Sequence, residues 1–272
     1  MSLNVLVAPP FGSNPDSPGT ASGSDCVHAG NQHDAWSTRI EIARSSGHPE
    51  DIEVLADEAP SPALRASARE LATETLRHRP LRKSPDKVFL FSGHMIDMPD
   101  RPEPRFPANK ESLAAARIGE ALDALGAGPG DFAIAQGAAG GDILFGEACI
   151  ERGIRLQILL PLPEAEFIEA SILPSAEGEA WRQRYLALRD KLSTPIRVMP
   201  PSYGSDSPTK NPFELCNRWL LDSALAQDAE HLAFICLWNG DDGDAAGGTA
   251  HMVKEVKRRA GQVIWLDTRR LW

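Results

Sequence analysis

Two spacings of apolar residues alternate along most of the chain, and their alternation predicts the fold. From Lys87 onward, short and nearly continuous apolar runs alternate with longer stretches whose apolar residues recur at helical spacing. Continuous apolar runs are typical of strands covered by helices on both faces. The pattern therefore predicts an α/β domain with a doubly wound, mainly parallel, Rossmann-like sheet of about six strands. The expected strands are 88–92, 132–136, 155–160, 196–199, 232–238 and 263–267. The expected helices are 110–125, 141–152, 179–192, 213–226 and 249–259.

Residues 1–86 differ in composition from the rest of the chain. The stretch 9–30 is rich in Pro, Gly, Ser and Asp, and it has too little apolar surface to offset the entropy of an ordered chain. Between positions 52 and 77 apolar residues recur at helical spacing, and Ser61 is suited to begin the helix. We therefore expect three parts: a flexible leader (1–50), a helical lead-in (51–86) and a Rossmann-like domain (87–272).

Charge and composition limit the class of ligand. The 272 residues are 42% hydrophobic and carry a formal charge of −10, with a pI near 5.2. Attraction to nucleic-acid backbones or anionic bilayers is disfavoured, so we expect no direct DNA binding and no membrane association. A polyanionic ligand then needs a local positive site. No apolar run approaches the ~20 residues that span a bilayer and the N-terminus lacks a signal-peptide pattern, which favours a cytoplasmic protein.

Cysteines and acidic residues do not indicate a metal site. The cysteines lie far apart with no CxxC pair: Cys26, Cys149, Cys216 and Cys236. Three of them fall in apolar segments, where a thiol behaves as a small hydrophobic side chain. The acidic stretch 241–244 lacks the full ligand spacing and the closing glutamate of a calcium loop. We therefore expect no metal and no required cofactor.

The residues that follow each strand are the first candidates for function, because ligands of open α/β sheets bind beyond the carboxyl ends of the strands. After the strand at 132–136, Gly137, Gly140 and Gly141 lead into a helix at Asp142. Glycine amides and a helix N-terminus can hold a phosphate without any lysine. A tight strand-to-helix turn with Asp142 as a cap or first-turn residue explains the same pattern.

A second glycine turn follows the strand that ends at Trp238. Gly247 and Gly248 leave room for a phosphate, and Thr249 is placed to cap the next helix or to donate its hydroxyl to that phosphate. Trp238 is suited either to stack on a base or to fill the rim of the core, whereas Trp265 is expected in the core.

The loop after the first strand carries the positive charge that an acidic protein needs to bind phosphate. Ser92, Gly93 and His94 end that strand, and Arg101 and Arg105 follow outside any helical pattern. The two arginines can form a bidentate phosphate clamp, with His94 as a hydrogen-bond donor or acid–base group. Pairing of the arginines with acidic residues of the same loop is an equally good interpretation.

With these segments the chain resembles the LOG- and DprA-like (SLOG) superfamily of Rossmann-like nucleotide-binding domains. The resemblance covers about residues 87–271, and its most specific part is GAAGGDILFGEACIERG at 137–153. SGHMID, RPEPRFP and GGTAHMV are similar to segments of SLOG-like domains found beside bacterial signalling modules. The resemblance implies a nucleotide or nucleotide-derived ligand, and it is compatible with a homo-oligomer. The superfamily's hydrolase branch carries a PGG-x-GT-x-x-E pattern, which residues 247–255 match only in part.

Three functions compete on this evidence. The preferred one is a sensor domain for a small-molecule nucleotide, with phosphate on the glycine turns, the loop arginines neutralising charge, and Trp238 or Phe106 beside the base. The alternative is an N-glycosidase acting on a nucleoside monophosphate or NAD-like substrate, with Glu147 or Asp142 stabilising an oxocarbenium-like transition state. The third is an interaction scaffold with a degenerate site. The resemblance supports the site more than the reaction.

Overall fold

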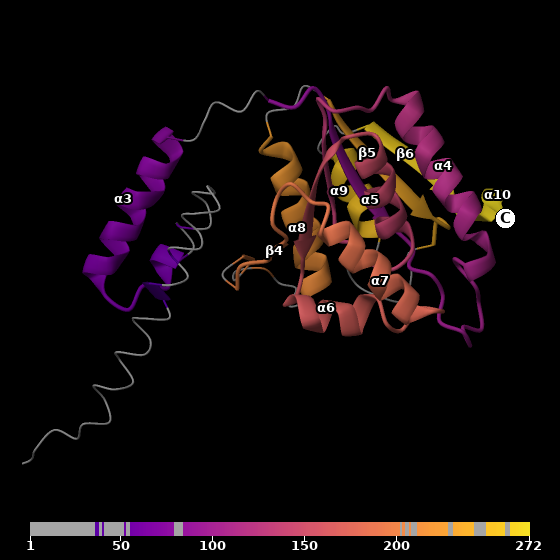
Figure 1. Cartoon of the computed structure of the whole chain (residues 1–272), viewed down its shortest axis with the longest axis horizontal. Helices are drawn as coiled ribbons and strands as arrows, with labels where there is room; N and C mark the ends of the chain where they lie inside the picture. Colours follow the sequence, from indigo (N-terminus) through magenta and orange to yellow (C-terminus); the bar gives the residue numbers. More distant parts are fainter. Residues whose placement is uncertain are drawn as a thin grey trace, which may run out of the picture. The chain divides into compact units, whose positions relative to one another are not determined.

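The computed structural model describes two units of the chain (Figure 1). The described residues are 36–37, 40, 52, 55–78, 84–201, 203–204, 207, 211–227, 231–241, 249–258 and 262–272. The chain divides into Met1–Arg79 and Pro80–Trp272. Most of the stretch expected to be a flexible leader, together with Cys26, lies outside the described residues, so that expectation stays a prediction.

The first unit has a small hydrophobic core of its own. Helix α3 (Pro62–His78) begins as expected, because the Ser61 hydroxyl accepts a hydrogen bond from the Leu64 N–H at 3.3 Å. The Trp36 indole donates to the carbonyl of Leu55 at 2.7 Å and ties the preceding helical residues together. The buried residues of this core are Trp36, Ile40, Ile52, Leu55, Ala56, Ala59, Ala68 and Ala72.

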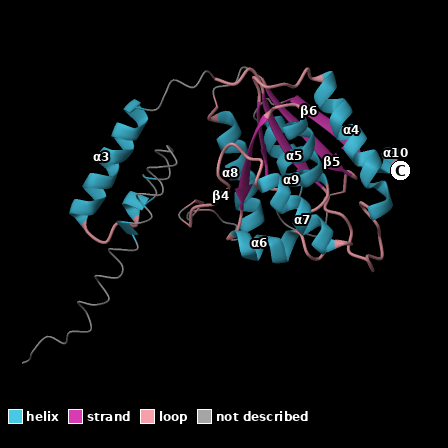
Figure 2. Ribbon diagram, in the orientation of Figure 1, coloured by secondary structure: helices cyan, strands magenta, loops and turns pink. Residues whose placement is uncertain are grey.

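The second unit is built on a six-stranded parallel sheet, which confirms the expected fold class (Figure 2). Its strand order is β4-β3-β2-β1-β5-β6. The strands are β1 (Val88–Gly93), β2 (Phe132–Ala135), β3 (Arg155–Leu160), β4 (Arg197–Val198), β5 (Leu232–Trp238) and β6 (Gln262–Asp267). Each matches an expected apolar run to within one or two residues, because burial on both faces selects continuous apolar sequence.

Helices cover both faces of the sheet. Helices α4 (Glu111–Ala124), α5 (Gly141–Glu151), α6 (Glu164–Ser171) and α7 (Gly178–Arg189) pack on one face around Phe89, Phe91 and Phe145. On the other face α8 (Pro212–Leu225) and α9 (Thr249–Arg258) pack around Leu90 and Phe234. The short helices η1 (Ala108–Lys110), α6 and α10 (Thr268–Leu271) were not expected as separate elements, since so few residues give no clear helical period.

The three cysteines of this unit that the structure describes are core residues, as expected. Cys149, Cys216 and Cys236 are free and buried, and burial raises the pKa of each thiol. Among the described residues, no helix combines the length and the apolar character needed to cross a membrane.

Strand β1 occupies the position that determines where a ligand can bind. It pairs with β2 on one side and, far along the chain, with β5 on the other, so that Val88 lies opposite both Phe132 and Leu232. The chain therefore winds in opposite directions from β1, which is the topological switch point of the sheet. In open α/β sheets the crevice for ligands lies at this point, outside the carboxyl ends of the strands.

Candidate ligand-binding site

The segments that follow β1 and β5 are joined at the switch point by His94. Its Nε2 accepts a hydrogen bond from the backbone N–H of Asn239 at 3.1 Å. An accepting Nε2 requires the neutral tautomer with its hydrogen on Nδ1. Burial, followed by the nearby charges of Arg105 and Arg101, lowers the pKa of His94 to about 4, which agrees with a neutral ring. The Asn239 side-chain oxygen, also 3.1 Å from Nε2, is then a close neighbour and not a second hydrogen bond.

Ser92 links the end of β1 to the start of α9. Its hydroxyl lies 3.1 Å from the hydroxyl of Thr249, and either group can donate. Gly93 continues β1 and lies opposite Leu237. Gly247 and Gly248 lie outside the described residues. The structure therefore brings Thr249 to the expected edge of the sheet, while phosphate binding by 247–249 stays a prediction.

The backbone N–H groups of the glycine turn after β2 donate hydrogen bonds to oxygens of the protein itself. The N–H groups of Gly137 and Ala138 donate to Asp142 Oδ2, at 3.1 and 3.3 Å. The N–H of Ala139 donates to the carbonyl of Ser171 at 3.0 Å. The N–H of Gly141 donates to the carbonyl of His94 at 3.1 Å. Four amides that were candidates to hold a phosphate thus fix the turn against its neighbours.

Gly140 shows how closely this turn lies against the loop after β1. It forms an isolated antiparallel bridge with Met95, and its φ is +102°. A Cβ at this position would lie 2.6 Å from the backbone nitrogen of Ile96. Only glycine fits such a left-handed, close-packed position without strain. The glycine is needed here for contact between two loops of the protein.

Asp142 is the buried acid of the turn. It lies in the first turn of α5, and only 6% of the residue is exposed. Burial raises the pKa of Asp142 to about 7, although the N–H groups of Ala138 and Gly137 act in the opposite direction. Its Oδ1 is buried and makes no hydrogen bond within the protein. Asp142 is therefore a buried acid of the first turn of α5 that fastens the glycine turn to the helix.

Glu147, the other carboxylate considered for catalysis, is held by an arginine. Arg184 of α7 donates to its two oxygens at 2.9 and 2.6 Å, and donates also to Glu111 of α4 at 2.7 Å. The guanidinium lies 4.2 Å from the ring centroid of Trp181. Arg184 thus joins α4, α5 and α7 on one face of the sheet, and Glu147 lies on a different side of α5 from Asp142.

The loop after β1 is shaped by Asp97. The Oδ2 atom of this buried carboxylate accepts from the backbone N–H groups of Arg105 and Phe106, at 2.9 and 2.8 Å. Its Oδ1 lies 3.4 Å from Arg101 Nε, which also donates to the carbonyl of Glu103 at 2.9 Å. One expected pairing of a loop arginine with an acidic neighbour is therefore present, and it holds Arg101 in place at the edge of a cavity.

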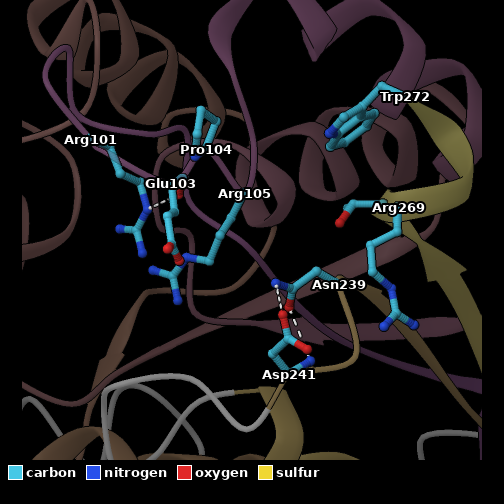
Figure 3. A pocket seen from close by; sticks show the side chains of 9 residues that line it. Arg101, Glu103, Pro104, Arg105, Asn239, Asp241, Arg269 and Trp272 are labelled. Atoms are coloured by element: carbon cyan, nitrogen blue, oxygen red, sulfur yellow. Dashed lines mark hydrogen bonds between the residues drawn. The ribbon is translucent and has the colours of Figure 1, made fainter.

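A cavity of about 520 Å³ opens beyond the carboxyl ends of β1, β5 and β6. Figure 3 shows Arg101, Glu103 and Arg105 on one side of it, Arg269 and Trp272 on the other, and Asn239 and Asp241 between them. The lining residues are Arg101, Glu103, Pro104, Arg105, Asn239, Asp241, Thr268, Arg269 and Trp272. The volume falls within the range of small-molecule sites, and the lining is mostly polar.

Positive charge prevails in the lining of the cavity. Three arginines face two carboxylates, in a protein whose formal charge is −10. Arg269 is held from behind, since its Nε and Nη2 donate to the two oxygens of Asp267, each at 3.0 Å, and this contact lowers the pKa of Asp267. Asn239 and Asp241 are also fixed, because Asn239 Nδ2 donates to Asp241 Oδ2 at 2.8 Å.

The aromatic residues differ from expectation. Trp265 was expected in the core, but 46% of it is exposed, because β6 is an edge strand and leaves part of this face uncovered. Trp238 packs beside it with ring centroids 5.7 Å apart. Phe106, expected beside the base, is fully buried under Trp272, with centroids 5.4 Å apart and planes at 19°. Trp272 is the aromatic residue that lines the cavity.

Four lining residues that carry chemistry are not among the binding residues expected from the sequence. These are Asn239, Asp241, Arg269 and Trp272. All of them follow β5 or β6, so the rule that led to the loop after β1 applies equally to the ends of these strands. Asn239 and Asp241 directly follow β5, and Arg269 and Trp272 follow the last strand. Among the described residues, no group of three or more His, Cys, Asp or Glu side chains is arranged to hold a metal ion.

Comparisons with known proteins give a distant likeness in fold. No family model and no curated protein matches the sequence. Among solved structures, the chain is similar to DNA processing protein A (DprA) from Streptococcus pneumoniae, with 9% identity, 88% of this chain and 93% of that chain covered, and a TM-score of 0.31. It is also similar to SuiB from Streptococcus suis, with 10% identity, 75% and 54% covered, and a TM-score of 0.17. The topology of the sheet itself defines a Rossmann-like α/β domain.

Proposed function

We propose that the Rossmann-like unit is a sensor domain that binds a nucleotide or nucleotide-derived messenger in the cavity at the switch point. The observation that carries this proposal is a cluster of three arginines around a cavity of about 520 Å³ at the carboxyl edge of the sheet, in an acidic protein. The sequence motifs at 92–97, 101–107 and 137–153 support placing the chain within the SLOG superfamily.

The arginines suit a phosphate for chemical reasons. A guanidinium presents donors in a planar fork that matches two phosphate oxygens, and it stays charged at every physiological pH. Arg101 and Arg269 are each oriented by a carboxylate behind them, Asp97 and Asp267. Such support reduces the side-chain entropy that a ligand has to overcome on binding.

In this proposal the glycine turn after β2 affects ligand binding only by positioning the loop after β1. Its bridge from Gly140 to Met95 fixes the start of the loop that carries the arginines. The second turn, with Gly247, Gly248 and Thr249, is proposed as a further phosphate contact from the α9 side, supported by the nearness of Thr249 to Ser92.

The proposal is tested by calorimetric titration of the full chain with AMP, ADP, cyclic AMP, the corresponding guanine nucleotides, ADP-ribose and NAD. At least one of them is expected to bind and to raise the melting temperature without being consumed. Arg105→Ala is expected to weaken that ligand roughly 10- to 100-fold, because a hydrogen bond to a charged group contributes about 1.5–3 kcal/mol.

Arg182→Ala is the matched control. Arg182 lies on the surface of α7, where it pairs only locally with Glu179, and it does not line the cavity. Binding that weakens equally in both variants would indicate general electrostatic attraction. A panel in which no compound binds would remove the proposed function.

A further inference from the structure

We infer that Trp272 is the platform on which the nucleobase stacks, opposite Arg101 and Arg105, which hold the phosphate. This inference rests on the proposed function, because it identifies the part of the cavity that separates nucleotides from simple sugar phosphates. Among the residues that line the described cavity, Trp272 alone has an aromatic ring.

The position of the Trp272 ring is fixed from one side. Phe106 stacks on it at 5.4 Å and 19°, and Phe106 is itself fully buried and held through its backbone N–H by Asp97. The N–H of Trp272 donates to the carbonyl of Thr268 at 3.2 Å, so the backbone of the residue is anchored as well. A ring supported on one face and lining a cavity is prepared to receive a second flat group.

The other tryptophans near this edge are less suited to the task. The Trp265 ring has Arg269 at 5.6 Å from its centroid and Trp238 at 5.7 Å. The Trp238 indole donates to the carbonyl of Asp241 at 2.8 Å, and that of Trp265 donates to the carbonyl of Trp238 at 2.9 Å. These two rings hold the loop after β5 and are absent from the lining of the cavity.

The order of groups across the cavity matches the order of groups in a nucleotide. Arg101 and Arg105 lie at one side, Asn239 and Asp241 in the middle, and Trp272 with Arg269 at the far side (Figure 3). A guanidinium binds a phosphate, an amide with a carboxylate binds ribose hydroxyls, and an indole ring stacks on a base. The cavity therefore fits a nucleoside phosphate better than a phosphate without a base.

The test compares AMP and GMP with ribose 5-phosphate by calorimetric titration of the full chain. Wild-type protein is expected to bind at least one of the nucleotides at least roughly 10-fold more tightly than ribose 5-phosphate. Stacking of a base on an aromatic side chain contributes an affinity difference of this size. Trp272→Ala is expected to abolish this preference and to leave the affinity for ribose 5-phosphate unchanged. Trp272→Phe keeps a ring and is expected to keep most of the preference.

The outcomes separate the two proposals. If ribose 5-phosphate binds as tightly as the nucleotides, the arginine site stands and the platform is wrong. If Trp272→Ala weakens all ligands equally, or Trp272→Phe behaves like Trp272→Ala, the ring has only a packing role and the inference also fails. If neither the nucleotides nor ribose 5-phosphate binds, the proposed function fails and the platform fails with it.

Discussion

The glycine turn after β2 and the cavity beside it are two regions at the same edge of one sheet, yet they use their polar groups in opposite ways. In the turn, the described amides of residues 137–139 and 141 donate to protein oxygens, and the Asp142 carboxylate accepts two of them. In the cavity, arginine, amide and carboxylate side chains line an open volume of about 520 Å³.

The difference shows that a glycine-rich strand-to-helix turn does not identify a binding site by itself. The same sequence can serve close packing of one loop on another, as Gly140 does against Met95 and Ile96. Changes in the turn and in α5 should therefore alter stability far more than ligand affinity.

Gly140→Ala is expected to have the largest effect. The added Cβ would lie 2.6 Å from the Ile96 nitrogen at a φ of +102°, so strain and a backbone shift should lower the free energy of unfolding by about 3–5 kcal/mol. Urea denaturation measures the change. The control is Gly128→Ala, where the new Cβ meets nothing within 4 Å, and we expect a change of about 0.5 kcal/mol or less. Equal stability of the two variants would contradict the close packing of the turn.

Asp142→Asn tests the buried acid through the pH dependence of stability. The pKa of Asp142 is raised to about 7 from an ordinary value of 3.8, so between these pH values the native state keeps a proton that the unfolded chain has released. The contribution is present below pH 4 and is lost as the pH rises to 7, on the order of 4 kcal/mol. Asparagine cannot ionise, so the variant should lack this loss. The measurement is the unfolding free energy of both proteins from pH 4 to 8.

His94 acts in the opposite direction in part of the same range, which is why the comparison with the variant is needed. Its pKa is lowered from 6.5 to about 4, so its contribution to stability rises with pH over that interval. Wild type and Asp142→Asn share His94, and the difference between their curves isolates the acid. Parallel curves would show that Asp142 is ionised throughout in the native protein.

Glu147→Gln is expected to have the smallest effect. Loss of the bidentate contact with the half-buried Arg184 should lower the unfolding free energy by about 0.5–1.5 kcal/mol and leave nucleotide affinity unchanged. Glu179→Gln, which removes an exposed pair on α7, is the control and should change stability by less than about 0.5 kcal/mol. Release of free base from a nucleotide by wild type, abolished in Glu147→Gln, would instead support the N-glycosidase.

The sequence predicted most of the sheet because its signal is local. Each strand is a short apolar run, and β3 and β5 occupy the residues expected for them. The edge strand β4 is shorter than expected and covers only Arg197–Val198. An edge strand has a hydrogen-bonded neighbour on one side only and is less buried, so it needs less apolar sequence. Helix α10 was missed because a single turn gives no period, although Asp267 caps it by accepting from the Arg269 N–H at 3.1 Å.

The site was predicted only in part, since its decisive contacts join distant residues. The loop arginines and His94 follow from the strand-end rule and lie at the expected edge. Whether the amides of the glycine turn remain available depends on its contact with residues 94–96, which no local pattern reveals. The position of Trp272 over Phe106 is likewise a tertiary contact.

The pairing of β1 with β5 has a consequence for how the protein is made. His94 and Asn239, which meet at the end of these strands, are 145 residues apart in the sequence. At a translation rate of about 5–20 residues per second, the central strand is made roughly 7 to 30 seconds before its second neighbour. During that interval one edge of the strand lacks its partner, and pairing between residues so far apart in the sequence is a slow step of folding.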